Sequence, residues 1–230
     1  MGTRLVLASF NKGKRREVSR ILHDIDVLSP PDFGIAGLPP EDGSTFLENA
    51  VIKAAFVAFQ TRMMAVGDDS GLEVEALEGR PGVHSARFAG PDADDAANID
   101  KLLAELESVG NRKARFACTA VLVVPFQVEP AVLADVQPVQ GIKVIQVSAA
   151  GRLPDGFSAF AACGTVEGEI IDDRRGHDGF GYDPVFLVPS LGLTFAEIPP
   201  DLKNDMSHRG KAFRALAPLI ARISDRGWAG

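Results

Sequence analysis

The sequence predicts an α/β fold, and two neighbouring patterns near the N-terminus carry that prediction. Residues 3–9 are expected to form a short buried strand, because residues 5–8 are one continuous apolar run. Polar residues then open a helix in which apolar side chains recur at helical spacing between Val18 and Leu22. A strand followed directly by a helix is half of a βαβ unit, so an α/β class is favoured over an all-α class.

Prolines and glycines divide the rest of the first half of the chain. Residues 29–43 are rich in both and are expected to form a loop. A second helix is predicted to begin near residues 44–45, and a strand over residues 63–66 to end at the sequence Gly-Asp-Asp-Ser-Gly. A glycine-containing loop over residues 78–90 and an amphipathic helix over residues 96–106 follow. Strands and helices therefore alternate through this half.

The second half is richer in strands. It is predicted to contain strands over residues 115–126, 143–147, 160–171 and 184–188 and a closing helix over residues 206–224. The segment from Phe126 to Gly156 includes three prolines and fits no clean element, so it is expected to be an extended hairpin or a variable insert. Because no internal repeat or long linker interrupts the chain, we expect one domain over residues 1–230, built as two lobes.

The composition of the 230 residues excludes several classes of protein. Apolar residues make up 46% and charged residues 24%, which is too apolar for a disordered chain. The 24 basic and 31 acidic side chains give a formal charge of −7, which disfavours a nucleic-acid binder because such proteins need a basic stripe. No apolar run approaches the ~20 residues of a membrane span. We therefore expect neither nucleic acid nor a membrane as a partner.

The cysteines and the N-terminus favour a cytoplasmic protein. Cys118 and Cys163 are the only cysteines, and each lies in an apolar or small-residue run, which is typical of reduced core residues. The first apolar stretch precedes its basic cluster, whereas a secretory signal has the opposite order.

The junction between the first strand and the first helix is a candidate phosphate site. A helix N-terminus offers unpaired backbone N–H groups and a partial positive charge. Ser9 and Asn11 can add hydrogen-bond donors, Gly13 allows the backbone to come close, and Lys14 adds a cation. The alternative is that Ser9 or Asn11 only caps the helix, with the basic residues on a solvated face.

Two adjacent carboxylates are a candidate metal site. Asp68 and Asp69, followed by Ser70 and Gly71, are expected at the carboxyl end of the strand over residues 63–66, where open α/β sheets bind ligands. Adjacent carboxylates in a turn suit Mg²⁺, which prefers one or two carboxylates together with substrate phosphates. The alternative is an ordinary turn without a ligand.

A glycine-rich loop over residues 176–184 carries two aromatic rings. Phe180 and Tyr182, the only tyrosine of the chain, can stack on a nucleobase, a contact worth ~1–3 kcal/mol. The alternative is that both rings bury themselves in a satellite core.

Cations gather near the start of the closing helix. Lys203, Arg209 and Lys211 are expected close to a helix N-terminus, where the helix dipole repels positive charge unless an anion joins it. The same argument applies to Lys14. Removing Lys14 or Lys203 is therefore expected to leave the stability of the ligand-free protein unchanged or slightly higher.

Six motifs in order resemble those of the inosine triphosphatase family, the non-canonical purine nucleoside-triphosphate pyrophosphatases. They are Ser9-x-Asn11-x-x-Lys14, Thr45-Phe46-x-Glu48-Asn49-Ala50-x-x-Lys53-Ala54, Asp68-Asp69-Ser70-Gly71-Leu72, Pro81-Gly82-Val83-His84-Ser85-Ala86-Arg87, Gly179-Phe180-Gly181-Tyr182-Asp183-Pro184 and Ser207-His208-Arg209-Gly210. Each motif alone is weak, but the ordered set spans residues 9–210 and is specific.

The resemblance implies an elongated α/β fold of two lobes around a long mixed β-sheet with flanking helices, and an active cleft between the lobes. It implies Mg²⁺-dependent hydrolysis of ITP, dITP and XTP to the monophosphate and pyrophosphate, usually by a homodimer. Such a reaction removes deaminated purines from the nucleotide pool.

The resemblance also assigns roles to residues. Asp69 would bind Mg²⁺ and act as the base toward water. Many relatives carry two consecutive acidic residues before the second helix, and one of the two helps to hold the metal. In this chain the first of these positions is Pro40, and the acidic residues Glu41 and Asp42 follow it. Glu41 is therefore the expected second metal ligand. The phosphates would be held by Ser9, Phe10, Asn11, Lys12, Gly13 and Lys14. The nucleotide would contact Ser70, Phe180, Gly181, Tyr182, Asp183, Lys203, His208 and Arg209.

Two other functions stay open. One is a pyrophosphatase for pyrimidine or modified nucleotides on a similar scaffold. The other is a nucleotide-binding regulatory module without turnover. Asp68 and Asp69 argue against the module, because a protein that only binds a triphosphate has no need to gather carboxylates beside it.

Overall fold

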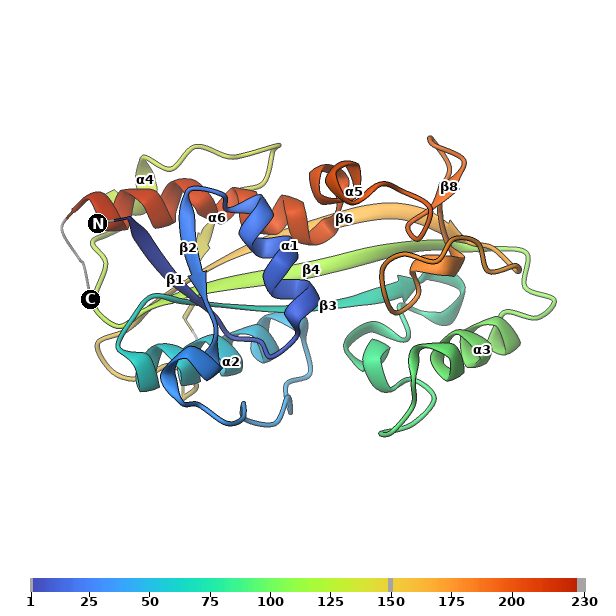
Figure 1. Cartoon of the computed structure of the whole chain (residues 1–230), viewed down its shortest axis with the longest axis horizontal. Helices are drawn as coiled ribbons and strands as arrows, with labels where there is room; N and C mark the ends of the chain where they lie inside the picture. The colour runs from blue at the N-terminus through green and yellow to red at the C-terminus, as the bar shows by residue number, and fades with distance from the viewer. Residues whose placement is uncertain (1, 149–150, 227–230) are drawn as a thin grey trace. The chain divides into compact units, whose positions relative to one another are not determined.

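The computed structural model describes residues 2–148 and 151–226, and these residues form an eight-stranded mixed β-sheet with flanking helices (Figure 1). The strand order is β2-β1-β3-β4-β6-β7-β8, with β5 paired to β6. β1 pairs in parallel with β2 and β3, whereas β6 pairs antiparallel with β5 and β7. The strands are β1 (Thr3–Leu7), β2 (Ile25–Leu28), β3 (Ala65–Val74), β4 (Lys113–Val124), β5 (Ile145–Gln146), β6 (Ser158–Ile170), β7 (Phe186–Val188) and β8 (Leu193–Thr194). The predicted α/β class with a mixed sheet is confirmed.

The helices alternate with the strands through the first half of the chain. They are α1 (Lys12–Ile21), α2 (Phe46–Thr61), α3 (Asp95–Glu105), α4 (Pro130–Ala134), α5 (Pro200–Met206) and α6 (His208–Asp225), with short 3₁₀ segments at Pro30–Phe33, Glu75–Leu77, Gly82–Arg87 and Asp183–Val185. Within residues 2–148 and 151–226, no helix has the length and apolar content that a membrane crossing requires.

The chain divides into two compact units. The first unit contains Met1–Asp69, Cys118–Gly164 and Arg209–Gly230, and the second contains Ser70–Ala117 and Thr165–His208. The strands β3, β4 and β6 contribute residues to both units.

The first unit has a core on each face of its strands. Leu5 and Leu7 of β1 pack with α1 and α6, whereas Val6 and Ala8 pack with α2, because successive side chains of a strand point to opposite faces. Figure 1 shows α6 and α2 on opposite sides of these strands. The buried side chains of β1 therefore face two helical layers in turn.

Gly67 of β3 allows α2 to approach the sheet closely. A Cβ at this position would lie 2.5 Å from the Ala50 carbonyl oxygen and 3.0 Å from Ala54 N, both of α2. Alanines along α2 complete this close packing, since Ala50, Ala54 and Ala58 are fully buried.

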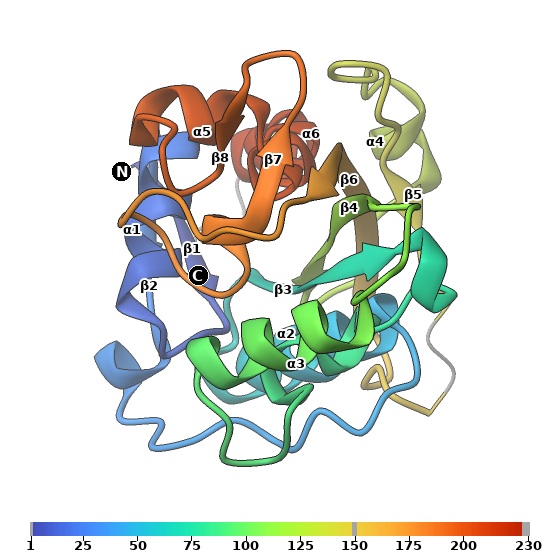
Figure 2. The ribbon, with the colours of Figure 1, turned by 90° about the vertical axis from the view of Figure 1, so that its right-hand side faces the viewer.

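The core of the second unit lies between α3 and one face of the strands. Ile99 and Leu102 of α3 pack with Leu72 of β3 and Phe116 of β4, and residues of β7 and the neighbouring loops close the group (Figure 2). The opposite strand face carries charged side chains.

The strand predicted over residues 63–66 proves longer than expected. β3 runs from Ala65 to Val74, so Asp68 and Asp69 lie inside a strand and not in a turn. The sequence Asp-Asp-Ser-Gly is typical of turns when taken alone. Here the partners of the two carboxylates come from elsewhere in the chain, and they stabilise charge inside the sheet.

The closing helix predicted over residues 206–224 is α6, which begins two residues later than predicted, at His208. The backbone of Ser207 is extended (φ −66°, ψ 154°) and separates α5 from α6. Lys203 therefore belongs to α5 and Arg209 to the first turn of α6.

The segment from Phe126 to Gly156 has little regular structure, as expected. It contains α4 and the two-residue strand β5, which replaces the longer strand predicted over residues 143–147. Val139 and Ile142 form an isolated antiparallel bridge. Residues 149–150 of the segment lie outside the described residues. The strands β2 and β8 and the 3₁₀ segments escaped prediction because they are short.

Candidate active site

The first helix begins directly after the first strand, with Asn11 as its N-cap. Asn11 Oδ1 accepts a hydrogen bond from Lys14 N at 3.0 Å, and Asn11 N donates to Ser9 Oγ at 3.1 Å. The capping role considered for Asn11 is therefore present. The first turn of α1 carries no acidic residue, so the positive end of the helix dipole stays suited to an anion.

Asp68 and Asp69 point to opposite faces of the sheet, because they are consecutive residues of β3. Val66, two residues before Asp68, packs with α1 and α6, whereas Ala65 packs with α2. The hydrogen-bond partners agree, since Asp68 contacts a residue of α1 and Asp69 a residue of α2. The two carboxylates therefore belong to separate polar groups within the first unit.

Asp68 accepts hydrogen bonds from two cations. Its Oδ2 atom lies 3.1 Å from Lys14 Nζ and 3.2 Å from Arg209 Nε. Arg209 Nη1 in turn donates to Glu17 Oε2 at 2.8 Å. Asp68 and Arg209 are 2% and 4% exposed, so two cations and two carboxylates balance one another in a largely buried group.

The charge of Asp68 is strongly stabilised. Burial alone would raise the pKa of this carboxyl, but the charges of Lys14, Arg209 and Lys53 outweigh burial and hold the pKa well below its usual range. Asp68 is therefore ionised at neutral pH and a poor proton acceptor. It also supplies, from within the protein, the anion that Lys14 and Arg209 need near their helix N-termini.

Asp69 lies in a second polar group, which is built on α2. Asn49 Nδ2 donates to Asp69 Oδ2 at 2.9 Å, and Asn49 Oδ1 accepts from Gly43 N at 2.8 Å. Asn49 is fully buried, so one amide orients the carboxylate and also fixes the loop before α2. The capping box of Thr45 and Glu48 begins the helix there.

Lys53 brings Glu41 and Asp69 into one group. Its Nζ atom lies 3.0 Å from Glu41 Oε1 and 3.9 Å from Asp69 Oδ1. Burial raises the pKa of Asp69 and the charge of Glu41 adds to this, although Lys53 and Asn49 oppose it. A carboxylate with a raised pKa is better suited to accept a proton from water than an ordinary one.

The donor set around Lys53 fits a magnesium ion. Two carboxylates, from Glu41 and Asp69, already share a cation, and Mg²⁺ is usually held by one or two carboxylates with water and substrate phosphates. Across residues 2–148 and 151–226, no three His, Cys, Asp or Glu side chains form a complete metal cage.

In the second unit, Asp183 connects a cation to the glycine-rich loop. Its Oδ2 atom accepts from Lys203 Nζ at 2.5 Å and from Phe180 N at 2.9 Å, and Asp183 is 4% exposed. Lys203 Nζ also lies 5.8 Å from the centre of the Phe180 ring. Lys203 thus has an internal counter-charge, as Lys14 does.

The two rings of the glycine-rich loop differ in their surroundings. Phe180 is 40% exposed and offers a face, whereas Tyr182 is 3% exposed and packs in the core of the second unit. The Tyr182 hydroxyl donates to the Ser85 carbonyl at 2.9 Å, and Gly181 N donates to Asp95 Oδ2 at 2.7 Å. Tyr182 is therefore a core residue, and only Phe180 has a ring that is exposed for stacking on a nucleobase.

His208 and Ser70 complete the predicted residues of the second unit. The buried His208 ring stacks on the Phe116 ring, with centres 5.0 Å apart and 15° between planes. Ser70 lies half-buried in β3. Among the predicted residues, three groups have contacts to an aspartate or share a lysine with it. Lys14 and Arg209 contact Asp68, Glu41 shares Lys53 with Asp69, and Phe180 and Lys203 contact Asp183.

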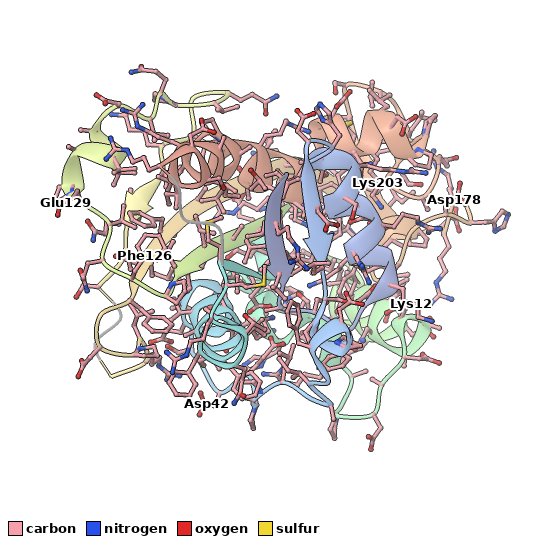
Figure 3. The ribbon with its side chains drawn as sticks, turned by 60° about the vertical axis from the view of Figure 1, so that its left-hand side comes forward. Lys12, Asp42, Phe126, Glu129, Asp178 and Lys203 are labelled. Atoms are coloured by element: carbon pink, nitrogen blue, oxygen red, sulfur yellow. The ribbon has the colours of Figure 1, made fainter. Side chains whose placement is uncertain are left out.

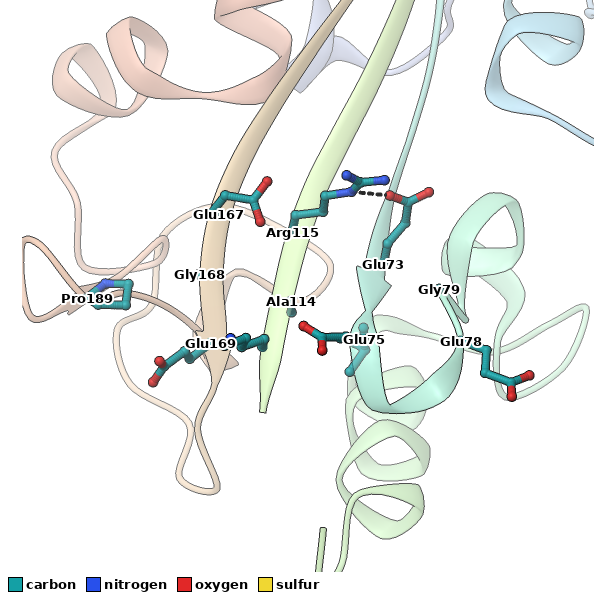
Figure 4. Close-up of a pocket in the computed structure, with 12 residues that line it drawn as sticks. Glu73, Glu75, Glu78, Gly79, Ala114, Arg115, Glu167, Gly168, Glu169 and Pro189 are labelled. Atoms are coloured by element: carbon teal, nitrogen blue, oxygen red, sulfur yellow. Dashed lines mark hydrogen bonds and ion pairs between the residues drawn. The ribbon is translucent and has the colours of Figure 1, made fainter. Parts of the chain in front are cut away.

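Two cavities differ in their relation to these groups. One, of about 180 Å³, is lined by Ser9, Phe10, Asn11 and Lys12 together with Arg15, Ser29, Pro31 and Asp32. The other, of about 740 Å³, lies on the charged strand face of the second unit, where Arg115 pairs with Glu73 (Figure 4). The second cavity contains none of the predicted site residues.

Glu17, Asn49 and Lys53 are site residues that the sequence-based set lacked. A signal for two of them was present: Asn49 and Lys53 are polar residues four positions apart, and between them and after them up to Phe59 the helix is apolar and rich in alanine. Glu17 carried no such signal, because its partner Arg209 is 192 positions away.

Comparisons with known proteins agree with the family resemblance found in the motifs. A model of the Ham1 family matches residues 5–142 and 133–219. The dITP/XTP pyrophosphatase of Methylococcus capsulatus is 44% identical over 228 residues, which cover 97% of this chain and 99% of that protein. The dITP/XTP pyrophosphatase of Geobacter sulfurreducens is 43% identical over 232 residues, with 99% and 98% covered.

Solved structures extend the similarity to the fold. The Staphylococcus aureus Ham1 protein matches with a TM-score of 0.73 at 34% identity, covering 97% of this chain and all of that one. The nucleoside-triphosphatase / dITP/XTP pyrophosphatase of Mycobacterium abscessus matches with a TM-score of 0.66 at 35% identity, covering 94% and 100%.

Proposed function

The chain belongs to the Ham1 family, and we propose that it is a dITP/XTP pyrophosphatase that also accepts ITP and releases the monophosphate and pyrophosphate. The relatives with this printed activity align over nearly their whole length. Within the molecule, the observation that carries the proposal is the Asp69 group. It joins a carboxylate of raised pKa to a second carboxylate and a buried lysine.

Asp69 is the proposed base. Asn49 donates to Oδ2 and orients the carboxylate, while Oδ1 faces Lys53 at 3.9 Å. The oxygen of a water molecule attacks the α-phosphorus of the triphosphate as Asp69 takes one of the protons of that water. The bond from phosphorus to the bridging oxygen breaks, and pyrophosphate leaves with the bonding electron pair.

Asp69 and Glu41 are the residues that would hold Mg²⁺. The chemistry that this ion supplies when bound is neutralisation of charge on the phosphate oxygens. Lys53 sits between the two carboxylates and limits their mutual repulsion in the ligand-free protein.

The β1–α1 junction is the proposed phosphate site. Ser9 to Lys14 line its cavity or begin α1, and Lys12 and Phe10 are exposed there. Lys14 can turn toward phosphate without leaving Asp68 unpaired, because Arg209 also donates to the same Oδ2 atom.

The second unit is proposed to hold the base. Phe180 supplies an exposed ring for stacking. Asp183 accepts hydrogen bonds from the backbone N–H of Phe180 and from the Lys203 ammonium, and so positions both residues. His208 is the proposed donor to a purine 6-oxo group in this unit, with Ser70 and Gly181 as further contacts. Arg209, which belongs to the first unit, is proposed as a second nucleotide contact. Tyr182 acts through its hydrogen bond to Ser85, which holds the loop.

A pyrophosphate-release panel tests this function. The purified chain is assayed with dITP, XTP, ITP, ATP, GTP, dTTP and CTP, with and without Mg²⁺. We expect fast release from the first three and little from ATP, because a 6-amino group presents a donor where the site provides donors. Preferred release from dTTP or CTP would favour a pyrimidine pyrophosphatase, and binding without release would favour a regulatory module.

A homodimer is part of the proposal. Light scattering coupled to size exclusion, at micromolar protein, checks it directly. A mass of twice the 24.4 kDa chain is expected, and a monomer would contradict it.

A further inference from the structure

Arg152 contacts the acidic pair from which the second metal ligand is drawn. Its Nη1 atom lies 3.0 Å from Asp42 Oδ1, and Asp42 lies at the surface of the first unit (Figure 3). Arg152 also contributes, after hydrogen bonds from Ser44 and Thr45, to the lowered pKa of Glu48. The guanidinium therefore faces the acidic start of α2.

The adjacent carboxylates Glu41 and Asp42 have different partners. Glu41 Oε1 lies 3.0 Å from Lys53 Nζ, within the Asp69 group, whereas Asp42 pairs with Arg152. The next residue, Gly43, is pinned by the hydrogen bond from its N–H to Asn49. A Cβ at Gly43 would lie 2.6 Å from Asn49 Oδ1, so this close approach depends on glycine.

Arg152 is followed in sequence by residues that pack on the core of the first unit. Its neighbour Leu153 packs against the buried cluster that contains α2. Phe157 is buried and donates its N–H to the Pro154 carbonyl. This packing fixes the backbone that follows Arg152, and the ion pair with Asp42 places its guanidinium.

We propose that Arg152 is a positioning residue that engages Asp42 and leaves Glu41 as the carboxylate facing Lys53 and Asp69. This inference rests on the proposed function. Two adjacent carboxylates otherwise compete for one inner position, and pairing one of them with a cation decides which is used. The ion pair is partly exposed, at 37% for Arg152 and 72% for Asp42, so its effect on metal affinity is modest.

Metal titrations of Arg152→Ala test the proposal. We expect the Mg²⁺ concentration for half-maximal pyrophosphate release to rise about two- to fivefold, the range of an exposed ion pair, with little change at saturating Mg²⁺. The dissociation constant of Mn²⁺ alone, followed by electron paramagnetic resonance without nucleotide, should rise by a similar factor. Arg174→Ala is the matched control, since Arg174 pairs with Asp100 at 2.8 Å and similar exposure; it should change neither value.

A second substitution separates ligand choice from a general loss of structure. In the parent protein, Glu41→Gln should weaken Mn²⁺ binding strongly. In the Arg152→Ala background Asp42 is released and can replace Glu41, so Glu41→Gln should cost less. The exchanged pair, Asp42→Arg with Arg152→Asp, should restore the parent Mg²⁺ dependence.

Two results would overturn the proposal: unchanged Mg²⁺ and Mn²⁺ titrations in Arg152→Ala, or an equal cost of Glu41→Gln in both backgrounds. If the alanine variant does not fold, Arg152→Gln replaces it, because glutamine keeps most of the side-chain length and removes the charge. It should give the same two- to fivefold rise, and unchanged titrations in it would equally overturn the proposal. If the parent protein releases no pyrophosphate from dITP, the proposed function fails instead, and the Mn²⁺ titrations still decide the role of Arg152.

Discussion

Asp68 and Asp69 are adjacent in β3 yet lie on opposite faces of the sheet, with different partners and oppositely shifted pKa values. Asp68 is held in its charged form by Lys14 and Arg209. Asp69 is oriented by Asn49 and made more basic by burial. The alternation of a strand therefore separates a structural anion from a proton acceptor.

The two aspartates are expected to affect stability in opposite directions. The pKa of Asp68 is lowered in the folded protein, so its ionised form stabilises the fold above its ordinary pKa of 3.8, and this stabilisation is lost as the pH falls below it. Asp68→Asn should therefore lower the free energy of unfolding at pH 7 by about 3 kcal/mol, because Lys14 and Arg209 lose their shared partner.

The pKa of Asp69 is raised, so folding favours its protonated form, and stability falls as the pH rises from 3.8 through the folded pKa. Asp69→Asn should therefore raise the free energy of unfolding at pH 7 and have no such effect below pH 3.8. Urea denaturation with EDTA between pH 3 and pH 8 measures both variants. Equal destabilisation by the two substitutions at pH 7 would contradict the assignment.

Lysine substitutions should destabilise the ligand-free protein, contrary to the expectation from the sequence. Lys14 and Lys203 each donate to a buried carboxylate, Asp68 and Asp183. Lys14→Ala and Lys203→Ala should each lower the free energy of unfolding by about 1–3 kcal/mol, the cost of weakening a buried charged hydrogen bond. Thermal unfolding without nucleotide checks this, with Lys12→Ala, an exposed residue, as the control. Unchanged melting temperatures would show that these lysines are not structural.

Asn49 should affect both catalysis and stability. Asn49→Ala leaves the Gly43 N–H without its partner and Asp69 without its donor, so we expect a loss of about 10- to 100-fold in activity, as for other residues that orient a ligand group. The acid limb of the pH–rate profile should also move to higher pH. Asn49 lowers the pKa of Asp69, so removing Asn49 raises that pKa. Asn98→Ala is the matched control: Asn98 also bridges two backbone groups, Ala86 and Ala89. It should cost similar stability without moving that limb.

Phe180 should contribute to nucleotide affinity without discriminating between bases. A ring face accepts any base, so Phe180→Ala should lower kcat/KM for dITP, XTP and GTP by a similar factor, equivalent to ~1–3 kcal/mol. Tyr182→Phe removes only the hydrogen bond to Ser85 and keeps the packed ring, so its effect should be smaller. Steady-state kinetics over the three nucleotides measure both. A selective loss for one base would show that Phe180 reads base identity.

The fold class was predictable because its signals are local. The apolar run of β1, the helical spacing of α1 and the capping box at Thr45 and Glu48 each depend on residues within a few positions of one another. The full length of β3 was not predictable, because the charges inside it are compensated by distant residues. Lys14 is 54 positions and Arg209 is 141 positions from Asp68.

The same difference explains what could be predicted of the site. The glycine-rich loop showed that Phe180 and Tyr182 lie together, but only the packing around α3 distinguishes an exposed ring from a buried one. Before α2, the family resemblance favoured Glu41 over Asp42 as the metal ligand, and in the structure Glu41 is the one that lies 3.0 Å from Lys53. Arg152, the partner of Asp42 in the structure, is 110 positions away from it, so this ion pair could not be predicted from the local sequence.

The most direct test of the account is pyrophosphate release from dITP by the parent protein and by Asp69→Asn at saturating Mg²⁺. Loss of a general base costs ~10²–10⁴ in rate, and weaker metal binding adds to it, so we expect Asp69→Asn to be at least about 10³-fold slower, roughly 4 kcal/mol of barrier. A folded Asp69→Asn variant that keeps most of the parent rate would contradict the role of Asp69 as base and metal ligand.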